Sequence, residues 1–473
     1  MIICTEKDDN YYLYKDAMKE RKVKFHIKDI FIEHWDNYKI KFANRKRRPI
    51  IDKIINKFLS CKTINLGWSI YRCPICDESK IVPHTCKTRF CSSCGNKYNE
   101  DRALSIKSKL FRWKHRHVVF TIPEELRGYF RNNRNLLNLL FKASSETIKC
   151  WFKEKYKKQN LIPAFVSVLH TYGRPLNFNP HIHMILLDGG ISNKDFVKIN
   201  FFSYASFRKR WMKLILDYLE NELGKDEFRK LKNNLYLKYP DGFYVYAPEC
   251  KFKTINGLLD YVCRYLSRPV MAESRIIDYD GEYVTFWYQR HEDNMVVIEK
   301  LHAYEFIQKL IMHIPEPNFK YIRFYGAYQN STIIKIDVAK LIDKAVIELK
   351  KNLNRWRKKI FIDFQFDPLK CPICHEEMVY YKCYYTWQGG ILMNKEEIKN
   401  DTDFFEFDFD DNGGSDIETT CLSCGYTEKV PDFIYDEMSR KKYHLKIRKK
   451  VSTLYCSRCQ KQTAIPKTFV DKK

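Results

Sequence analysis

The sequence contains no run of about 18 apolar residues, which is the length that a membrane-spanning helix needs. It also lacks the pattern of a secretory leader, because its first ten residues are acidic rather than basic and then apolar. Acidic residues are few relative to basic ones, 58 Asp and Glu against 84 Lys and Arg. We therefore expect a cytoplasmic protein without a membrane-spanning segment.

The formal net charge of +26 is the clearest indication of a partner. An excess of this size favours a polyanion, and the basic runs at residues 355–359 and 440–450 contain interleaved aromatic residues. That mixture suits phosphates together with stacked bases, in DNA or RNA. The length of 473 residues, with 45% hydrophobic and 15% aromatic residues, indicates a globular chain of two to four domains.

The cysteines follow a pattern that is typical of metal sites. Ten of the 17 form five Cys-x-x-Cys pairs, which in a reducing compartment indicate zinc rather than disulfides. The first two pairs, Cys73–Cys76 and Cys91–Cys94, are fourteen residues apart, close to the spacing of a zinc ribbon. Cys86 lies between them and is the alternative ligand. We predict a structural zinc ion at this site.

Three more pairs follow near the C-terminus: Cys371–Cys374, Cys421–Cys424 and Cys456–Cys459. The first two could form a second zinc ribbon, interrupted by an acidic insert at residues 400–418. The third pair then has no partner pair, although it could bind an additional zinc ion. The spacing leaves open which of these pairs combine.

The central feature of the chain is a predicted pair of antiparallel strands, residues 166–173 and 181–190, joined by a turn rich in Gly, Pro and Asn. His181 and His183 are two residues apart and therefore point to one face. If the hairpin closes, His170 on the first strand joins them. Three neutral imidazoles on one face suit a divalent metal ion with open coordination positions. Alternatively, they are ordinary polar residues of a half-exposed strand.

A predicted helix over residues 255–267 carries the second candidate set. Tyr261, Arg264, Tyr265 and Arg268 follow one another at i, i+3, i+4 and i+7, so they share one face. Tyrosine can act as a covalent nucleophile, and nearby guanidinium groups favour the phenolate and bind phosphate. We predict the two tyrosines as nucleophiles and the two arginines as phosphate-binding residues. The alternative is that the tyrosines only pack.

Together these features predict attack on a phosphodiester. A metal ion polarises the phosphate, and a phosphotyrosine keeps the energy of the broken bond, so the strand can be rejoined without ATP. Two adjacent tyrosines permit two successive transfers. That chemistry is strand exchange rather than digestion.

Several motifs between residues 30 and 330 resemble, in order, the blocks of the insertion sequence 91 family of transposases. They are Ser92-Ser-Cys-Gly95, Leu169-His-Thr-Tyr-Gly-Arg174, Asn179-Pro-His-Ile-His183, Tyr261-Val-Cys-Arg-Tyr-Leu-Ser-Arg-Pro269, His313-Ile-Pro315 and Ile322-Arg-Phe-Tyr-Gly326. The segment His181-Ile-His183 is also similar to the His-hydrophobic-His motif of the HUH nucleases, to which that family belongs.

The resemblance implies single-stranded DNA as substrate, a 5′-phosphotyrosine intermediate and a Mg²⁺ or Mn²⁺ ion. It assigns His181 and His183 as ligands of that ion and Tyr261 and Tyr265 as the nucleophile pair. His170 as third ligand depends on the hairpin geometry and on a similar upstream histidine of relaxases. The partners would be the ends of the mobile element and target DNA, with the protein at the bacterial nucleoid when it is bound to DNA.

The expected fold is α+β. An HUH-type antiparallel sheet with flanking helices would form the catalytic core, between an N-terminal zinc-binding module and C-terminal zinc-ribbon-like modules. The predicted boundaries are residues 1–110 for the helical and zinc-binding domain, 111–335 for the catalytic domain, 336–369 for a basic helical linker and 370–473 for the cysteine-rich region.

Two other functions are compatible with parts of this pattern. A rolling-circle replication initiator or relaxase would share the active site, but the N-terminal zinc block and the Arg323-Phe-Tyr-Gly326 block favour a transposase. A non-catalytic zinc-ribbon regulator that binds nucleic acid would use the histidines and tyrosines only for packing. That alternative predicts no metal-dependent cleavage.

Overall fold

The computed structural model describes residues 2–4, 24–192, 196–199, 202–246, 270–290, 295–329, 357, 367–387, 391–394, 416–421, 424, 427–431, 454–455 and 462–466. The chain forms two compact units. One comprises Met1–Leu66, Arg72–Glu78 and Pro83–Val379, and the other comprises Gly67–Tyr71, Ser79–Val82 and Tyr380–Lys473. Helices and antiparallel sheets are both present, as expected of an α+β protein. Among the described helices, none has the length and apolar character needed to cross a membrane.

The first unit contains an antiparallel sheet with the strand order β12-β5-β6-β4-β8, and β7 pairs with β6. Its strands are β4 (His115–Phe120), β5 (Ile162–Tyr172), β6 (Phe178–Ile191), β7 (Phe196–Lys198), β8 (Val245–Tyr246) and β12 (Ile322–Gly326). The long strands β5 and β6 are the predicted hairpin, which is therefore confirmed. Both are almost wholly buried, because their β-branched and apolar residues face a core on each side of the sheet.

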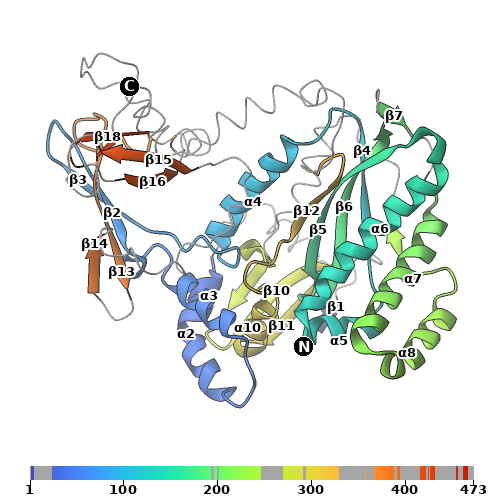
Figure 1. The fold of residues 1–473 in the computed structure, drawn as a ribbon. Helices are drawn as coiled ribbons and strands as arrows, with labels where there is room; N and C mark the ends of the chain where they lie inside the picture. The colour runs from blue at the N-terminus through green and yellow to red at the C-terminus, as the bar shows by residue number, and fades with distance from the viewer. Residues whose placement is uncertain are drawn as a thin grey trace. The chain divides into compact units, whose positions relative to one another are not determined.

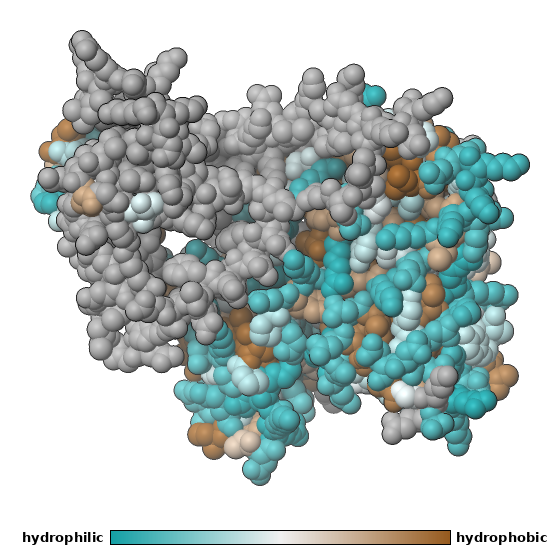
Figure 2. Space-filling view, in the orientation of Figure 1, coloured by the Kyte–Doolittle hydropathy of each residue, from teal (hydrophilic) through white to brown (hydrophobic). Residues whose placement is uncertain are grey.

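Helices cover one face of this sheet: α5 (Glu124–Asn132), α6 (Leu137–Lys155), α7 (Tyr204–Leu223) and α8 (Lys225–Lys238) (Figure 1). Trp151 of α6 and Trp211 of α7 are fully buried there against strand residues such as Phe120 and Leu186. The outward side of these helices is largely hydrophilic (Figure 2). The helices are thus amphipathic, and they leave the other face of the sheet for other contacts.

The opposite face of the sheet carries the alternate strand residues, among them Val166, Val168 and Ile185. They pack against Phe111 and the end of α4 (Ser92–Lys107). At the edge, Gly326 has φ of +61°, and a Cβ atom built on it would lie 1.8 Å from the Pro163 carbonyl oxygen. Only glycine allows β12 to close against β5 there, which explains the last residue of the Arg-Phe-Tyr-Gly block.

A second antiparallel sheet has the order β1-β11-β10-β9, with β1 (Ile2–Cys4), β9 (Ile276–Tyr279), β10 (Tyr283–Gln289) and β11 (Val296–His302). The N-terminal helices α2 (Ile27–Lys41) and α3 (Pro49–Leu59) share a core with this sheet and with α10 (Ala303–Ile311). Phe31, Trp35 and Phe58 from the helices pack in it with Phe286 and Phe306. The N-terminal helices and the segment from β9 to α10, which are far apart in the sequence, therefore form one core.

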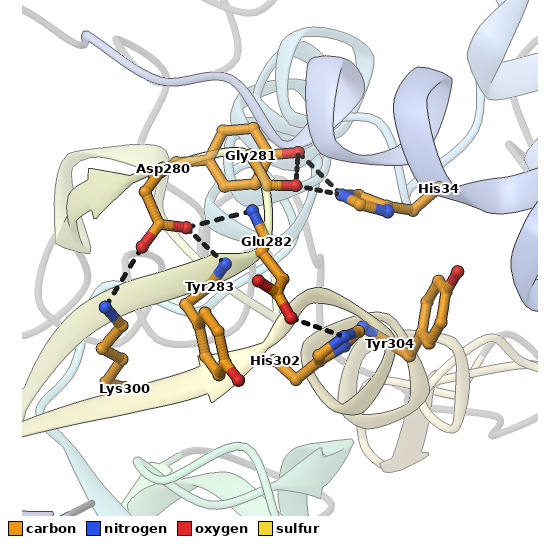
Figure 3. A network of polar contacts seen from close by, with 9 residues as sticks. His34, Asp280, Gly281, Glu282, Tyr283, Lys300, His302 and Tyr304 are labelled. Carbon is orange, nitrogen blue, oxygen red and sulfur yellow. Dashed lines mark hydrogen bonds and ion pairs between the residues drawn. The ribbon is translucent and has the colours of Figure 1, made fainter.

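Polar contacts at the turn between β9 and β10 also hold helix α2 in place (Figure 3). Asp280 accepts backbone N–H groups of Tyr283 (2.6 Å) and Glu282 (3.0 Å), and these bonds lower the pKa of Asp280 to about 2. His34 of α2 donates to the Gly281 carbonyl oxygen (2.8 Å) in the same turn. The carboxylate shapes the turn, and the turn then binds the helix.

Two four-stranded sheets complete the description. One has the order β14-β13-β2-β3, with β2 (Trp68–Arg72), β3 (Ser79–Pro83), β13 (Val379–Trp387) and β14 (Ile391–Asn394). The other has the order β16-β15-β18-β17, with β15 (Asp416–Cys421), β16 (Thr427–Pro431), β17 (Leu454–Tyr455) and β18 (Gln462–Pro466). Single 3-10 turns occur at Ile64–Leu66, Arg134–Leu136, Lys157–Gln159 and Glu273–Arg275.

Candidate metal centres

The strand register places the three predicted histidines together. His170 lies directly opposite His181 across the β5–β6 pair, and His183 lies two residues further along β6 on the same face. One ring nitrogen from each of the three lies within 4.8 Å of the others. His170 and His183 are 6% and 7% exposed. The site is therefore built on a pair of strands, and His183 has a strand neighbour on each side, Val168 of β5 and Val119 of β4.

The spacing of the ring nitrogens fits a metal ion. The Nδ1–H of His181 donates to the Asn179 carbonyl oxygen (2.7 Å), so its Nε2 carries the lone pair in the neutral ring. The Nε2 atoms of His181 and His183 are 3.0 Å apart. With metal–nitrogen bonds of about 2.1 Å, two ligands at right angles lie about 3.0 Å apart. This donor set suits a divalent ion with positions left for substrate.

Burial keeps the imidazoles in the form that binds metal. The pKa of His183 is well below its ordinary value, first because the ring is buried and then because His170, His181 and His117 surround it. A neutral ring offers a lone pair, whereas an imidazolium does not. At neutral pH the site is therefore ready to bind a cation without first losing a proton.

His117 belongs to this site but was not among the predicted ligands. Its Nε2 lies 2.8 Å from Nδ1 of His183, and the two rings stack with centroids 5.0 Å apart. If His183 binds an ion through Nε2, its Nδ1–H donates to His117, which orients the ligand ring. Burial, and then His181, lower the pKa of His117 to about 4, so it stays an acceptor. The alignment of β4 with β6 could not be read from the sequence.

His313 supports the turn of the hairpin from the helix-covered side. Its Nδ1 accepts the Thr171 hydroxyl (3.2 Å), and its Nε2–H donates to the Leu176 carbonyl oxygen (3.2 Å). Leu176 has φ of +59° within the turn. Burial is the main cause that lowers the pKa of His313 to about 3, and the positive charge of Arg134 lowers it further. The hydrogen bond to Leu176 raises the pKa but is outweighed.

We predict that protonation of His313 destabilises the fold in acid. The pKa of His313 is lower in the folded protein than in the unfolded chain. The neutral ring therefore contributes fully to the free energy of unfolding above pH 6.5, and this contribution is lost as the pH falls toward 3. Between pH 7 and pH 5 the loss is about 2 kcal/mol. Urea titrations of wild type and His313→Gln at both pH values measure it. An equal pH dependence in the two proteins would show that His313 does not titrate on unfolding.

The first cysteine cluster consists of Cys61, Cys86, Cys91 and Cys94, all buried. The Sγ atom of Cys94 lies 3.6 Å from that of Cys61 and 3.6 Å from that of Cys86, and the Sγ atoms of Cys91 and Cys61 are 3.8 Å apart. Four thiolates on one zinc ion lie about 3.8 Å apart, so the cluster fits zinc. Cys91 precedes the first turn of α4, which contains Cys94. A Cβ atom on Gly95 would lie 2.7 Å from the Arg89 carbonyl oxygen, which explains the glycine after Cys94.

The predicted combination of cysteine pairs is wrong. Cys73 and Cys76 do not join Cys91 and Cys94; they lie with Cys371 and Cys374 in a second cluster. The reason is that Cys73 and Cys76 are on the loop between β2 and β3, and these strands separate them from Cys61 and Cys86. Cys61 was not predicted, because it is a lone cysteine outside every Cys-x-x-Cys pair.

The pairing of the C-terminal cysteines, which the spacing left open, is resolved in part, since Cys371 and Cys374 are grouped with Cys73 and Cys76 rather than with Cys421 and Cys424. Cys421 is the last residue of β15, and Cys424 is exposed. The other predicted site residues lie outside the described ranges: Tyr261, Arg264, Tyr265, Arg268, Cys456 and Cys459.

Two family models match the chain. One is the transposase zinc-binding domain, over residues 30–122, which includes the whole buried cysteine cluster. The other covers residues 164–333, which include the three histidines, and bears the description "Putative transposase". No solved structure matches the chain. The matches and the two sites define a zinc-binding protein of the transposase class.

Known relatives agree with this classification. The chain is similar to the transposase for insertion sequence element IS801 from Pseudomonas savastanoi pv. phaseolicola, with 28% identity over 358 residues, 70% of this chain and 84% of the relative. It is also similar to a protein of Sinorhizobium fredii that bears the name "Putative transposase y4qJ", with 28% identity over 327 residues, 64% of this chain and 80% of the relative. The chain belongs to the insertion sequence 91 family of transposases and has an N-terminal zinc-binding domain.

Proposed function

We propose that this protein nicks single-stranded DNA by tyrosine attack, holds the strand as a 5′-phosphotyrosine and transfers it, in transposition of the rolling-circle type. The observation that carries the proposal is the trio His170, His181 and His183, with two Nε2 atoms 3.0 Å apart on a buried sheet. Its spacing suits Mg²⁺ or Mn²⁺, which would polarise the scissile phosphate when bound.

The arrangement of the sheet supports an HUH-type core. The two histidines of the His-Ile-His segment lie on β6, between β5 and β4, while Ile182 points to the helix-covered core. The metal-binding face and the structural face are thus separated along a single strand. The histidines thus lie on the face of the sheet that is turned away from α6 and α7.

The proposed reaction exchanges one phosphodiester for another. The phenolate oxygen of one tyrosine, Tyr261 or Tyr265, attacks the phosphorus, and the bond from phosphorus to the 3′ oxygen breaks. The 3′ oxygen leaves and takes up a proton to become a hydroxyl. In the second step a 3′ hydroxyl of the target attacks the phosphotyrosine and restores the phenol. Arg264 and Arg268 would offset the phosphate charge.

Exposed tyrosines beside the metal site suit the bases of a single strand. Tyr246 on β8 is opposite Val119, and Val119 is opposite His183, so all three lie on the same face. Tyr244 and Tyr246 are 52% and 46% exposed, with ring centroids 6.4 Å apart and planes 20° from parallel. The guanidinium of Arg208 lies 5.0 Å from the Tyr244 ring centre. Aromatic rings beside a cation are typical of single-strand binding surfaces.

We predict that Tyr244→Ala with Tyr246→Ala weakens binding of single-stranded DNA by about tenfold for each ring that stacks on a base. The double Tyr→Trp variant should keep most of the affinity, because it keeps the stacking surface. Tyr236→Ala on α8 is the control, since that tyrosine is 40% exposed on another element. Fluorescence anisotropy with a labelled oligonucleotide measures the affinity, and an equal loss in the control would contradict the assignment.

The decisive experiment uses purified protein, Mn²⁺ and labelled single-stranded DNA that carries the flanks of the gene. Products are separated on a denaturing protein gel. A shifted band that disappears on nuclease treatment would establish the covalent intermediate. Firm DNA binding to both flanks without a shifted band would contradict the proposal and favour a regulator that binds nucleic acid.

A further inference from the structure

The second cysteine cluster consists of two matching half-sites. Each is the same tetrapeptide, Cys73-Pro-Ile-Cys76 in one and Cys371-Pro-Ile-Cys374 in the other. Both lie in the first compact unit, 295 residues apart when measured from Cys76 to Cys371. The isoleucine of each loop is exposed, 71% for Ile75 and 64% for Ile373. The two loops thus present the same side chains in the same way.

The backbone of the two half-sites also matches. In the first, the Cys73 N–H donates to the Glu78 carbonyl oxygen (2.8 Å), and the Asp77 N–H donates to the Cys73 carbonyl oxygen (3.1 Å). The corresponding bonds in the second, Cys371 to Glu376 and His375 to Cys371, have the same lengths, 2.8 Å and 3.1 Å. The residue after the second cysteine has positive φ in both, +63° at Asp77 and +59° at His375.

The sulfur atoms of the two loops face one another. Sγ of Cys374 lies 3.3 Å from that of Cys73 and 3.5 Å from that of Cys76, and Cys76 lies 3.5 Å from Cys371. These separations are far longer than a disulfide bond and close to the spacing of about 3.8 Å for thiolates on tetrahedral zinc. Four thiols gathered at this distance are a complete set of zinc ligands.

Ion pairs hold the second loop in this position. Arg357 donates to the carboxylates of Asp367 (2.6 Å and 2.7 Å) and Glu377 (2.6 Å), which flank the loop on both sides. Asp367 also accepts the Leu369 N–H (3.1 Å). Ion pairs and backbone hydrogen bonds therefore fix the shape of this half-site. Such fixation is expected of a loop that holds a metal ion rather than of an ordinary surface loop.

The geometry points to one structural zinc ion shared by Cys73, Cys76, Cys371 and Cys374, a split site that closes 295 residues of chain into a loop. This ion is separate from the one expected at Cys61, Cys86, Cys91 and Cys94. The two sites differ in access, because the first cluster is buried at all four positions, whereas Cys76 is exposed. The split site is therefore the one that a chelator reaches first.

Counting zinc in full-length variants by native mass spectrometry tests the sharing. Cys73→Ser with Cys76→Ser should lose one zinc per chain, and so should Cys371→Ser with Cys374→Ser. The quadruple variant should also lose one and not two, because both pairs hold the same ion. Cys150→Ser is the control, since Cys150 is half-buried and outside both clusters. A loss of two ions in the quadruple variant, or none in a double variant, would overturn the split site.

A second measurement uses the wild-type chain and does not depend on the folding of variants. Zinc is removed with a chelator, adjacent thiols are oxidised with diamide, and disulfide-linked peptides are mapped. The expected product joins the peptide of Cys73 and Cys76 to that of Cys371 and Cys374. A product in which Cys371 or Cys374 is joined mainly to Cys421 or Cys424 would overturn the proposal.

Discussion

His183→Ala should lower the rate of Mn²⁺-dependent cleavage of single-stranded DNA by about a thousandfold, or ~4 kcal/mol. The ring is buried between His181 on its own strand and His117 on β4, so its removal would take away a central member of the proposed ligand set. Single-turnover rates at saturating protein measure the effect. Affinity for DNA should change little, because exposed basic and aromatic groups dominate it.

His117→Ala is the matched control for this experiment. His117 lies on the same face but would contact the proposed ion only through His183, so the expected loss of rate is only about 10- to 100-fold. Added Mn²⁺ should recover part of the rate in His117→Ala and none in His183→Ala, because the first variant weakens the ion's binding while the second removes a ligand. An unchanged rate in His183→Ala would exclude this residue from the metal site.

The variant Tyr261→Phe with Tyr265→Phe should abolish the covalent DNA adduct and leave the affinity for DNA nearly unchanged. Phenylalanine keeps the ring and loses only the oxygen that attacks phosphorus. Each single variant should still form an adduct but fail to complete strand transfer, because two successive transfers need two nucleophiles. Tyr236→Phe on α8 should behave as wild type.

The adduct is measured as a shifted band on a denaturing gel, and transfer as a joined product of two labelled oligonucleotides. Loss of DNA affinity in the double variant, matching the loss of adduct, would show that the tyrosines act in binding. An adduct that survives in the double variant would assign the nucleophile to another residue.

Much of the sheet that carries the three histidines could be predicted because its signals are local. The β-branched and apolar residues of β5 and β6 and the turn residues between them indicate a hairpin, and the register then places His170 opposite His181. Helices α6, α7 and α10 have buried apolar residues at helical spacing over two or more turns, which is a local pattern that indicates amphipathic helices. The histidine trio follows from these local features alone.

The remaining contacts depend on pairings between distant segments. His117 reaches His183 only through the pairing of β4 with β6, and Cys61 joins its cluster only because α3 ends near the start of α4. Cys73 and Cys374 are 301 residues apart in the sequence, and the known spacings of zinc ligands apply only to cysteines that are close in sequence. The Cys-x-x-Cys spacing thus correctly indicated cysteine clusters suited to zinc, but it combined the wrong cysteine pairs at the first site.

The distance in sequence between the two cysteine half-sites also sets an order in time. At about 5–20 residues per second, a ribosome needs about 15–60 s to advance the 295 positions from Cys76 to Cys371. Throughout that interval the first Cys-Pro-Ile-Cys loop has only two of its four ligands. A nascent chain can therefore complete its histidine site before its second zinc site, and only chains translated beyond residue 374 can close the loop.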